Sequence, residues 1–136
     1  MKRVIFDTNF LLIPGQFGLD IISETDRLMT ETFQYAILDE TLKELQHIKE
    51  VQKGLHRAAS HLALQIIEKN NFVVVDTKLL QKRIKTKYVD SLLLSIAKSQ
   101  PHQTIVATQD RALKKALKFV GIPVIVMKGE NHLFFG

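Results

Sequence analysis

The sequence predicts a three-layer α/β fold, and two observations lead to this fold class. Short apolar runs rich in β-branched residues recur along the chain, and several are continuous, as is typical of strands covered on both faces in a parallel sheet. Helical patterns separate these runs, and strands that alternate with helices imply right-handed crossovers. The expected strands are Val4–Phe6, Tyr35–Leu38, Phe72–Val75, Thr104–Ala107 and Val124–Val126.

Apolar residues at helical spacing predict the helices that connect these strands. The expected helices carry the stripe Leu42–Val51 and the segments Leu55–Lys69, Val89–Lys98 and Arg111–Val120. Gly54 separates the first two, and Gly121 with Pro123 ends the last. Pro14–Gly18 is expected to be a loop between the first strand and its helix. The aromatic tail His132–Phe135 is expected to pack back on the core or to cover a partner.

Composition limits the class of protein. The chain has 136 residues and a mass of 15.5 kDa, which predicts a single domain over residues 1–136. No apolar run is long enough for a bilayer and no signal-peptide pattern precedes the first strand, so no membrane association is expected. The absence of cysteine excludes disulfides and thiolate metal sites and fits a reducing cytoplasm. A net charge of +5 favours a polyanionic partner.

Acidic residues recur near the ends of the expected strands and at the starts of helices. Asp7 directly follows the first strand, where open α/β sheets bind ligands, although an Asx-turn or a helix cap would also explain it. Glu44 lies one turn into the helix after the second strand, and Thr41–Glu44 also fits a capping box. Asp90 and Asp110 precede apolar stripes, and each fits a capping role by itself.

Helix caps explain these acids singly, but they do not explain why the acids recur at corresponding places. Carboxylates that lie close together repel one another unless cations neutralise them. Oxygen ligands without cysteine or paired histidine suit Mg²⁺ or Mn²⁺ rather than structural zinc. We therefore expect a divalent metal site formed by Asp7, Glu44, Asp90 and Asp110.

The order of these residues resembles that of a PIN domain. The segments that carry the resemblance are Asp7-Thr8-Asn9, Leu42-Lys43-Glu44-Leu45, Asp90-Ser91-Leu92-Leu93 and Thr108-Gln109-Asp110-Arg111-Ala112-Leu113. The resemblance spans nearly the whole chain. It is greatest to small stand-alone prokaryotic or archaeal members and to the related ribosome-assembly type.

The resemblance implies a five-stranded parallel sheet in the order 3-2-1-4-5 and Mg²⁺- or Mn²⁺-dependent cleavage of RNA. The metal-binding and catalytic acids that it implies are Asp7, Glu44, Asp90 and Asp110, with the hydroxyl groups of Thr8 and Thr108 orienting water or the acids. It also implies a cytoplasmic protein that self-associates, which the Phe134-Phe135 tail would support, and an antitoxin or ribosome-assembly partner.

Two positions depart from the common pattern of the family. Many members have a second acid where this chain has Ser91, so binding of one ion is better supported than binding of two. Many also have Asn where this chain has Gln109. Basic residues flank two of the acids and are candidates for binding RNA phosphates: Lys78, Lys82, Arg83, Lys85, Lys87, Arg111, Lys114, Lys115 and Lys118.

Three functions remain open at this point. The first is a metal-dependent endoribonuclease, either the toxin of a toxin–antitoxin pair or an RNA-processing enzyme. The second is a non-catalytic RNA-binding or ribosome-assembly module, which Ser91 favours. The third is a phosphoacceptor domain of the receiver type with Asp7 as acceptor, which the placement of the acids fits less well. A serine-hydrolase elbow, a P-loop and a dinucleotide fingerprint are all absent from the sequence.

Overall fold

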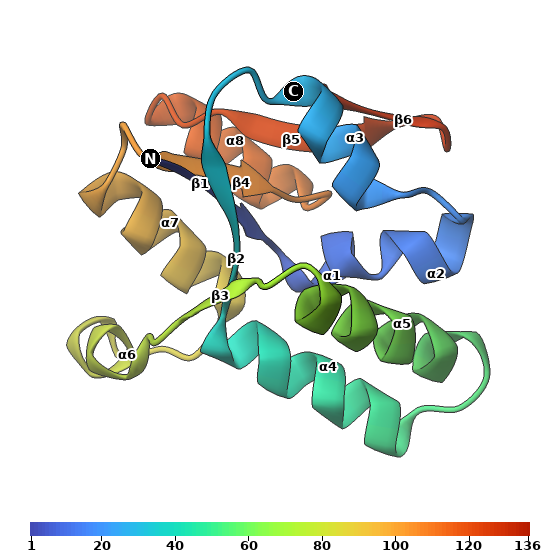
Figure 1. Ribbon diagram of the computed structural model, residues 1–136. Coiled ribbons are helices and arrows are strands. Elements are labelled where there is room, and N and C mark those ends of the chain that lie inside the picture. Colours follow the sequence, from blue (N-terminus) through green and yellow to red (C-terminus); the bar gives the residue numbers. More distant parts are fainter.

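The computed structural model describes residues 1–136 and contains one six-stranded sheet with helices on both faces (Figure 1). The elements in chain order are β1 (Lys2–Phe6), α1 (Thr8–Leu11), α2 (Ile13–Phe17), α3 (Ile21–Leu28), β2 (Phe33–Leu38), α4 (Asp39–Val51), α5 (Leu55–Lys69), β3 (Val73–Val75), α6 (Lys78–Ile84), α7 (Val89–Ser99), β4 (Thr104–Ala107), α8 (Arg111–Phe119), β5 (Val124–Lys128) and β6 (His132–Phe135).

The sheet has the strand order β3-β2-β1-β4-β5-β6. The first five strands are parallel, which confirms the predicted α/β class and the order 3-2-1-4-5. The tail His132–Phe135 adds β6 antiparallel to β5, so the sheet has one strand more than the five that were expected. A receiver-type sheet has the order 2-1-3-4-5, and the observed order therefore excludes the phosphoacceptor alternative.

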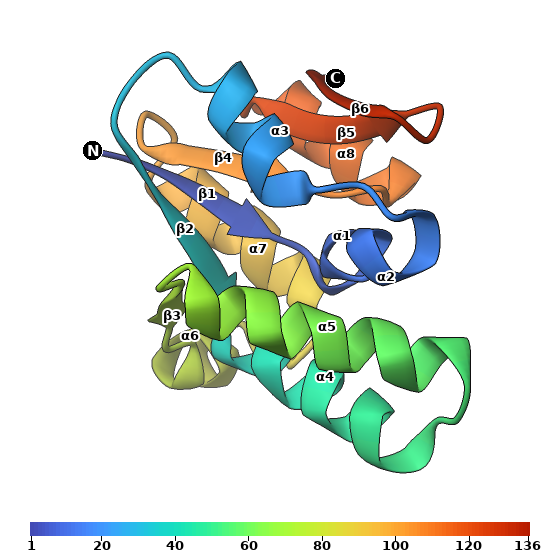
Figure 2. The ribbon, with the colours of Figure 1, turned by 45° about the vertical axis from the view of Figure 1, so that its right-hand side comes forward.

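Alternate residues of the strands fill two separate cores, one on each face of the sheet. Val4 and Phe6 of β1 face the core under α1, α3 and α5, whereas Ile5 faces the core under α7 and α8. Figure 2 shows α3 and α5 in front of the sheet and α7 and α8 behind it. Both faces are covered, and this is why the strands lack a polar alternation.

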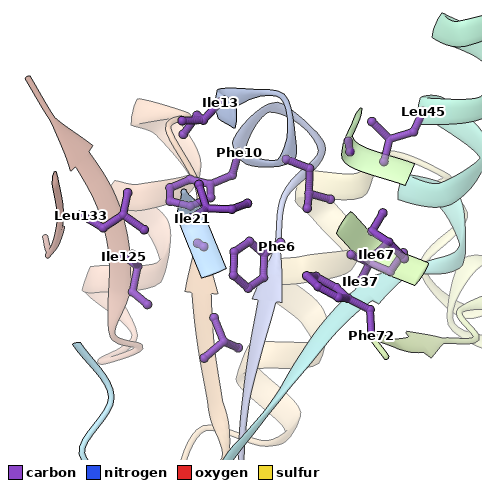
Figure 3. Close-up of a cluster of buried hydrophobic side chains, with 14 of the residues drawn as sticks. Phe6, Phe10, Ile13, Ile21, Ile37, Leu45, Ile67, Phe72, Ile125 and Leu133 are labelled. Atoms are coloured by element: carbon purple, nitrogen blue, oxygen red, sulfur yellow. The ribbon is translucent and has the colours of Figure 1, made fainter. Parts of the chain in front are cut away.

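Aromatic rings occupy the middle of the first core (Figure 3). Phe6 is fully buried, and its ring centroid lies 5.6 Å from that of Phe10 and 5.5 Å from that of Phe72. Burial of an aromatic side chain is a large apolar contribution to stability, and tilted or edge-on ring pairs add about 1 kcal/mol each. The strand that carries Phe6 is thereby held firmly up to its last residue, immediately before Asp7.

The expected loop at residues 14–18 is wrong, because residues Ile13–Phe17 form helix α2. Pro14 lies in the first turn, where its missing N–H would have had no partner in the helix. A Cβ on Gly15 would lie only 2.5 Å from the Cα of Ala59, so glycine is needed for α2 to pack against α5. Gly18, with a φ of 71°, ends the helix in the left-handed conformation.

Helix α6 was not expected, and a long-range contact fixes its start. Asp39, the first residue of α4, accepts hydrogen bonds from the backbone N–H of Thr77 at 3.0 Å and from its hydroxyl at 2.5 Å. Gln81 of α6 donates to the same Thr77 hydroxyl at 2.8 Å. The carboxyl end of β2 is therefore tied to α6 at one edge of the sheet.

None of the helices combines the length and the apolar character that crossing a bilayer would require.

Candidate active site

The four acids predicted from the sequence line one cleft at the carboxyl edge of the sheet. The cleft has a volume of about 390 Å³. Its lining residues are Asp7, Thr8, Asn9, Leu12, Glu44, Ile48, Tyr88, Val89, Asp90 and Asp110. Asp7 follows β1 and Asp110 follows β4, whereas Glu44 lies on the second turn of α4 and Asp90 on the first turn of α7. The carboxyl ends of β1 and β4 meet because these strands are parallel neighbours, which is the position where open α/β sheets bind ligands.

Asp7 is the most deeply placed of these acids, with 7% of its surface exposed. One carboxylate oxygen accepts the backbone N–H of Thr8 at 2.8 Å, and this bond caps α1. The other oxygen accepts the hydroxyl of Thr108 at 2.7 Å. Asp7 therefore both caps α1 and borders the cleft. Its two hydrogen bonds fix the orientation of the buried carboxylate.

Thr108, which is fully buried, connects two of the acids. Its hydroxyl donates to Asp7 and accepts the backbone N–H of Asp110 at 3.1 Å. Asp110 caps α8 by accepting the N–H of Leu113 at 2.9 Å through one oxygen. The second carboxylate oxygen of Asp110 has no hydrogen-bond partner in the protein and remains available to a ligand.

Glu44 does not form the capping box that its sequence context suggested. Helix α4 begins at Asp39, and Leu38 at its N-cap makes no side-chain cap, so Thr41 and Glu44 lie within the helix. The buried Thr41 hydroxyl accepts a hydrogen bond from the Thr8 hydroxyl at 3.3 Å, which holds the start of α4 against the start of α1. Glu44, one turn further along, borders the cleft instead of folding onto its own backbone.

Asp90 lines the cleft and is exposed. One of its oxygens accepts the backbone N–H of Ser91 at 2.9 Å, within the first turn of α7, where a negative charge also suits the helix dipole. The other oxygen has no partner in the protein. Ser91, at the position where a second acid is common, is exposed and adds no carboxylate to the cleft.

The pKa values of two acids in the cleft are shifted by burial and by the other carboxylates. Burial raises the pKa of Asp7, the Thr108 hydroxyl and the Thr8 N–H lower it in part, and the charges of Asp110 and Asp90 raise it further. Glu44 is exposed by surface area, but neighbouring atoms still remove part of its hydration and raise its pKa. The Thr8 hydroxyl opposes this shift, and the charges of Asp7, Glu40 and Asp90 add to it. The acids are thus close enough to repel one another.

The donor set fits a hard divalent cation, because it consists of carboxylates without thiolate or imidazole. Burial chiefly raises the pKa of Asp7, and a cation would offset both this burial and the added repulsion from Asp110 and Asp90. The side chains do not have the geometry of a complete metal site, because no three His, Asp or Glu groups lie close enough together to bind one ion. The sequence thus predicted which acids share the cleft, but not their detailed arrangement.

Tyr88 and Asn9 line the cleft although neither was assigned a role from the sequence. Tyr88 is 76% exposed and lies at the N-cap position of α7, two residues before Asp90. The sequence did contain a signal for Tyr88, because a large aromatic residue lies there beside a candidate ligand and a basic run. Asn9 is exposed next to Asp7 in the first motif. The histidines take no part in the cleft.

Comparisons with known proteins agree with this architecture. A family described as "PIN like domain" matches residues 4–130. Ribonuclease VapC4 of Methanocaldococcus jannaschii is 30% identical over 134 residues, which cover 97% of this chain and 95% of that protein.

Two solved structures share the fold. The PIN domain endonuclease Utp24 superimposes with a TM-score of 0.75 at 20% identity, over 98% of this chain and 90% of the other. A domain of a functionally unknown protein from Methanocaldococcus jannaschii gives 0.60 at 17% identity, over 95% and 93%. The strand order, the position of the cleft and the match over residues 4–130 lead to one conclusion: the chain belongs to the PIN-like domain family.

Proposed function

We propose that this protein is a divalent-metal-dependent endoribonuclease that hydrolyses phosphodiester bonds of RNA in the acidic cleft. The observation that carries the proposal is the convergence of four carboxylates from distant parts of the chain at one sheet edge, with the pKa of Asp7 and of Glu44 raised. Such a cluster is unfavourable in an apoprotein and becomes favourable when it binds cations. Membership of the PIN-like family and the 30% identity to a protein named as a ribonuclease support the same activity.

The residues of the cleft have different roles in this proposal. Asp7 is the fixed ligand, because its two hydrogen bonds leave it little freedom to rotate. Asp90 and Asp110 each supply the carboxylate oxygen that has no partner in the protein, and Glu44 contributes from α4. Bound there, Mg²⁺ or Mn²⁺ would activate a water for attack on phosphorus and offset the charge of the phosphoryl oxygens. Thr108 acts as a positioning residue through Asp7 and Asp110.

The variant Asp7→Asn tests this function. Asparagine still accepts the Thr8 N–H, so the fold is expected to persist, but a charged ligand is lost. We expect cleavage of a labelled RNA in Mn²⁺ to fall by at least roughly 100-fold, because direct charge stabilisation by a metal is worth several kcal/mol. In this proposal water is the nucleophile and the 3′-oxygen is the leaving group, so the product of wild-type cleavage should carry a 5′-phosphate.

Asp20→Asn is the matched control. Asp20 caps α3 by accepting the N–H groups of Ile22 and Ser23, it lies outside the cleft, and asparagine preserves such a cap. Its cleavage rate should equal that of the wild type. Full activity of Asp7→Asn, or equal loss in both variants, would contradict the assignment.

A second candidate is a non-catalytic RNA-binding or assembly module with the same fold. The observation that favours it is the absence of three acids close enough to bind one ion, together with Ser91 in place of an acid. Incubation with Mn²⁺ and both structured and unstructured RNA separates the two functions, because this alternative predicts binding without products. The two biological settings expected from the sequence, toxin or RNA-processing enzyme, both require cleavage, and an adjacent antitoxin gene would identify the first.

A further inference from the structure

A second hollow adjoins the acidic cleft and differs from it in charge. Its volume is about 720 Å³, larger than that of the cleft. We call it the basic hollow, and α6 and the turn after α6 form its walls. Its lining residues are Lys78, Gln81, Lys82, Lys85, Thr86, Lys87 and Tyr88. Tyr88 lines both the basic hollow and the acidic cleft, so the two hollows are neighbours that share this residue.

The lysines of the basic hollow form no ion pair within the protein. The hollow also has no acidic lining residue. Lys78 and Lys82 lie four residues apart on one stripe of α6, and Lys85 follows as the C-cap residue of this helix. Like charges in such a stripe repel one another, so a bound polyanion would relieve a repulsion already present in the free protein.

Tyr88 gives the basic hollow an aromatic surface. Its side chain is 76% exposed, and its ring does not pair with any other aromatic ring of the protein. A tyrosine left in water in this way contributes little to the core, and most of its surface is accessible to a ligand. Base stacking on an aromatic face does not depend on base identity, and it is a common basis for binding single strands.

The turn that presents these groups is ordered by its own hydrogen bonds. Lys85 ends α6 in the left-handed conformation with a φ of 58°. Thr86 donates its N–H to the carbonyl of Gln81 at 3.3 Å, and its hydroxyl accepts the N–H of Tyr88 at 3.1 Å. Through Thr77, α6 is also bound to Asp39 at the carboxyl end of β2. The basic hollow is therefore held in a fixed position relative to the acidic cleft.

We propose that the basic hollow binds a single-stranded stretch of RNA, with its phosphates on the lysines and one base stacked on Tyr88, and so places the neighbouring phosphodiester at the acidic cleft. The inference rests on the proposed function, because the bound strand is cleaved only if the acidic cleft is a ribonuclease site. It adds the residues that select an unpaired strand.

The combination of lysines with an open aromatic ring favours this ligand over two others. In a duplex the bases are stacked within the helix, and none is free to lie on Tyr88. An acidic peptide would use the lysines but has no base to stack on the ring. The three ligands therefore differ in whether their binding depends on the ring of Tyr88.

Binding is best measured in an Asp7→Asn background, where cleavage does not interfere. Fluorescence anisotropy with a short labelled RNA reports the affinity of Tyr88→Leu and Tyr88→Phe. Leucine keeps apolar volume but has no ring, so we expect affinity to fall roughly 5- to 150-fold, the range for loss of one stacked base. Phenylalanine keeps the ring, so affinity should stay within about twofold of the parent, a difference too small to indicate lost stacking.

The lysines are tested through the salt dependence of the same binding. Removing two phosphate contacts with Lys82→Ala and Lys87→Ala should reduce the slope of log affinity against log salt by about 1.4, since each contact on a single strand contributes about 0.7. Lys69→Ala with Lys98→Ala is the matched control, because these residues are also exposed, form no ion pair and lie at helix ends that lead into the opposite edge of the sheet. That pair should leave the slope unchanged.

Three results would overturn the inference: equal affinity of Tyr88→Leu and Tyr88→Phe, a duplex of the same sequence bound as tightly as the single strand, or polyglutamate bound with the higher affinity. The exposed position of Tyr88 makes unfolding an improbable cause of any loss, and an unchanged Tm verifies this. Ring-dependent binding without cleavage by the wild type would leave the inference standing and refute the proposed function. Cleavage by the wild type that Tyr88→Leu leaves unchanged would support the proposed function and refute this inference.

Discussion

The three residues that follow β4 show how single side chains form the site. Thr108 donates to Asp7, Asp110 caps α8, and Gln109 between them reaches β5. The side-chain oxygen of Gln109 accepts the N–H of Met127 at 2.7 Å, and its side-chain nitrogen donates to the carbonyl of the same residue at 3.4 Å. This side chain therefore continues the ladder along β5 beyond the point where β4 ends at Ala107. The position where asparagine is common in the family thus has a structural role in this chain.

Shortening Gln109 by one methylene is expected to break these contacts. Gln109→Asn keeps the amide but should not reach Met127, so we expect the free energy of unfolding to fall by about 1 kcal/mol, the usual net value of such hydrogen bonds. Urea denaturation measures this loss. Gln100→Asn, on an exposed glutamine whose side chain makes no hydrogen bond, is the control. Equal stability of the two variants would show that the Met127 contacts contribute nothing.

At the scale of elements, helix α3 completes the sheet by binding the outer edge of β6. Glu24 accepts the N–H of Leu133 at 3.0 Å, and Arg27 donates to the carbonyl of Leu133 at 2.8 Å. The two side chains also form an ion pair at 3.2 Å, and His132 contacts Glu24 at the same distance. Unpaired backbone groups at a sheet edge promote association with other strands, so this pair covers an otherwise reactive edge at Leu133.

The contacts of Glu24 predict a specific pH dependence of stability. The Arg27 guanidinium first, and the Leu133 N–H with it, lower the pKa of Glu24 from 4.5 to about 2. Because the folded pKa is depressed, the carboxylate stabilises the protein fully above pH 4.5 and loses this contribution as the pH falls towards 2. The difference in Tm between wild type and Glu24→Gln should therefore be largest near neutral pH and shrink across that window.

Glu50→Gln serves as the comparison, because Glu50 is exposed and forms no ion pair. Its Tm should follow the wild type at every pH. A constant gap between wild type and Glu24→Gln from neutral pH to pH 2 would mean that Glu24 acts through packing rather than charge.

The elements that the sequence predicted are those defined by local pattern. Strands β1 to β5 and the long helices follow from continuous apolar runs and helical stripes, and the acids at their ends follow from strand order. Helix α2 was missed because Pro14 and Gly15 are usually helix breakers, whereas here Pro14 lies in the first turn and Gly15 meets Ala59. Helix α6 and strand β6 depend on contacts with Asp39 and Glu24 from distant segments, which no local window contains.

At the scale of the whole molecule, charge of each sign is concentrated on adjoining surfaces at the carboxyl edge of the sheet. The acidic cleft repels a polyanion, and the basic hollow beside it attracts one. Such an arrangement suits a substrate that is held by its backbone on one surface and approaches the acids only where a cation compensates for them. Like charges lie side by side within each of these two surfaces, and both surfaces are candidates for ligand binding.

Binding of a cation to the acidic cleft should therefore stabilise the folded protein. A ligand at 100 times its Kd adds about 2.7 kcal/mol, which corresponds to a rise in Tm of roughly 5 to 10 °C for a chain of this size. Differential scanning fluorimetry with increasing Mn²⁺ at constant ionic strength measures this rise. Asp110→Asn should diminish it, whereas Asp20→Asn should not. Both residues cap a helix and asparagine preserves both caps, so the two variants differ chiefly in that only Asp110 lines the cleft. An equal rise in both variants would place the ion elsewhere on the protein, and the acids would then be explained by their helix caps alone.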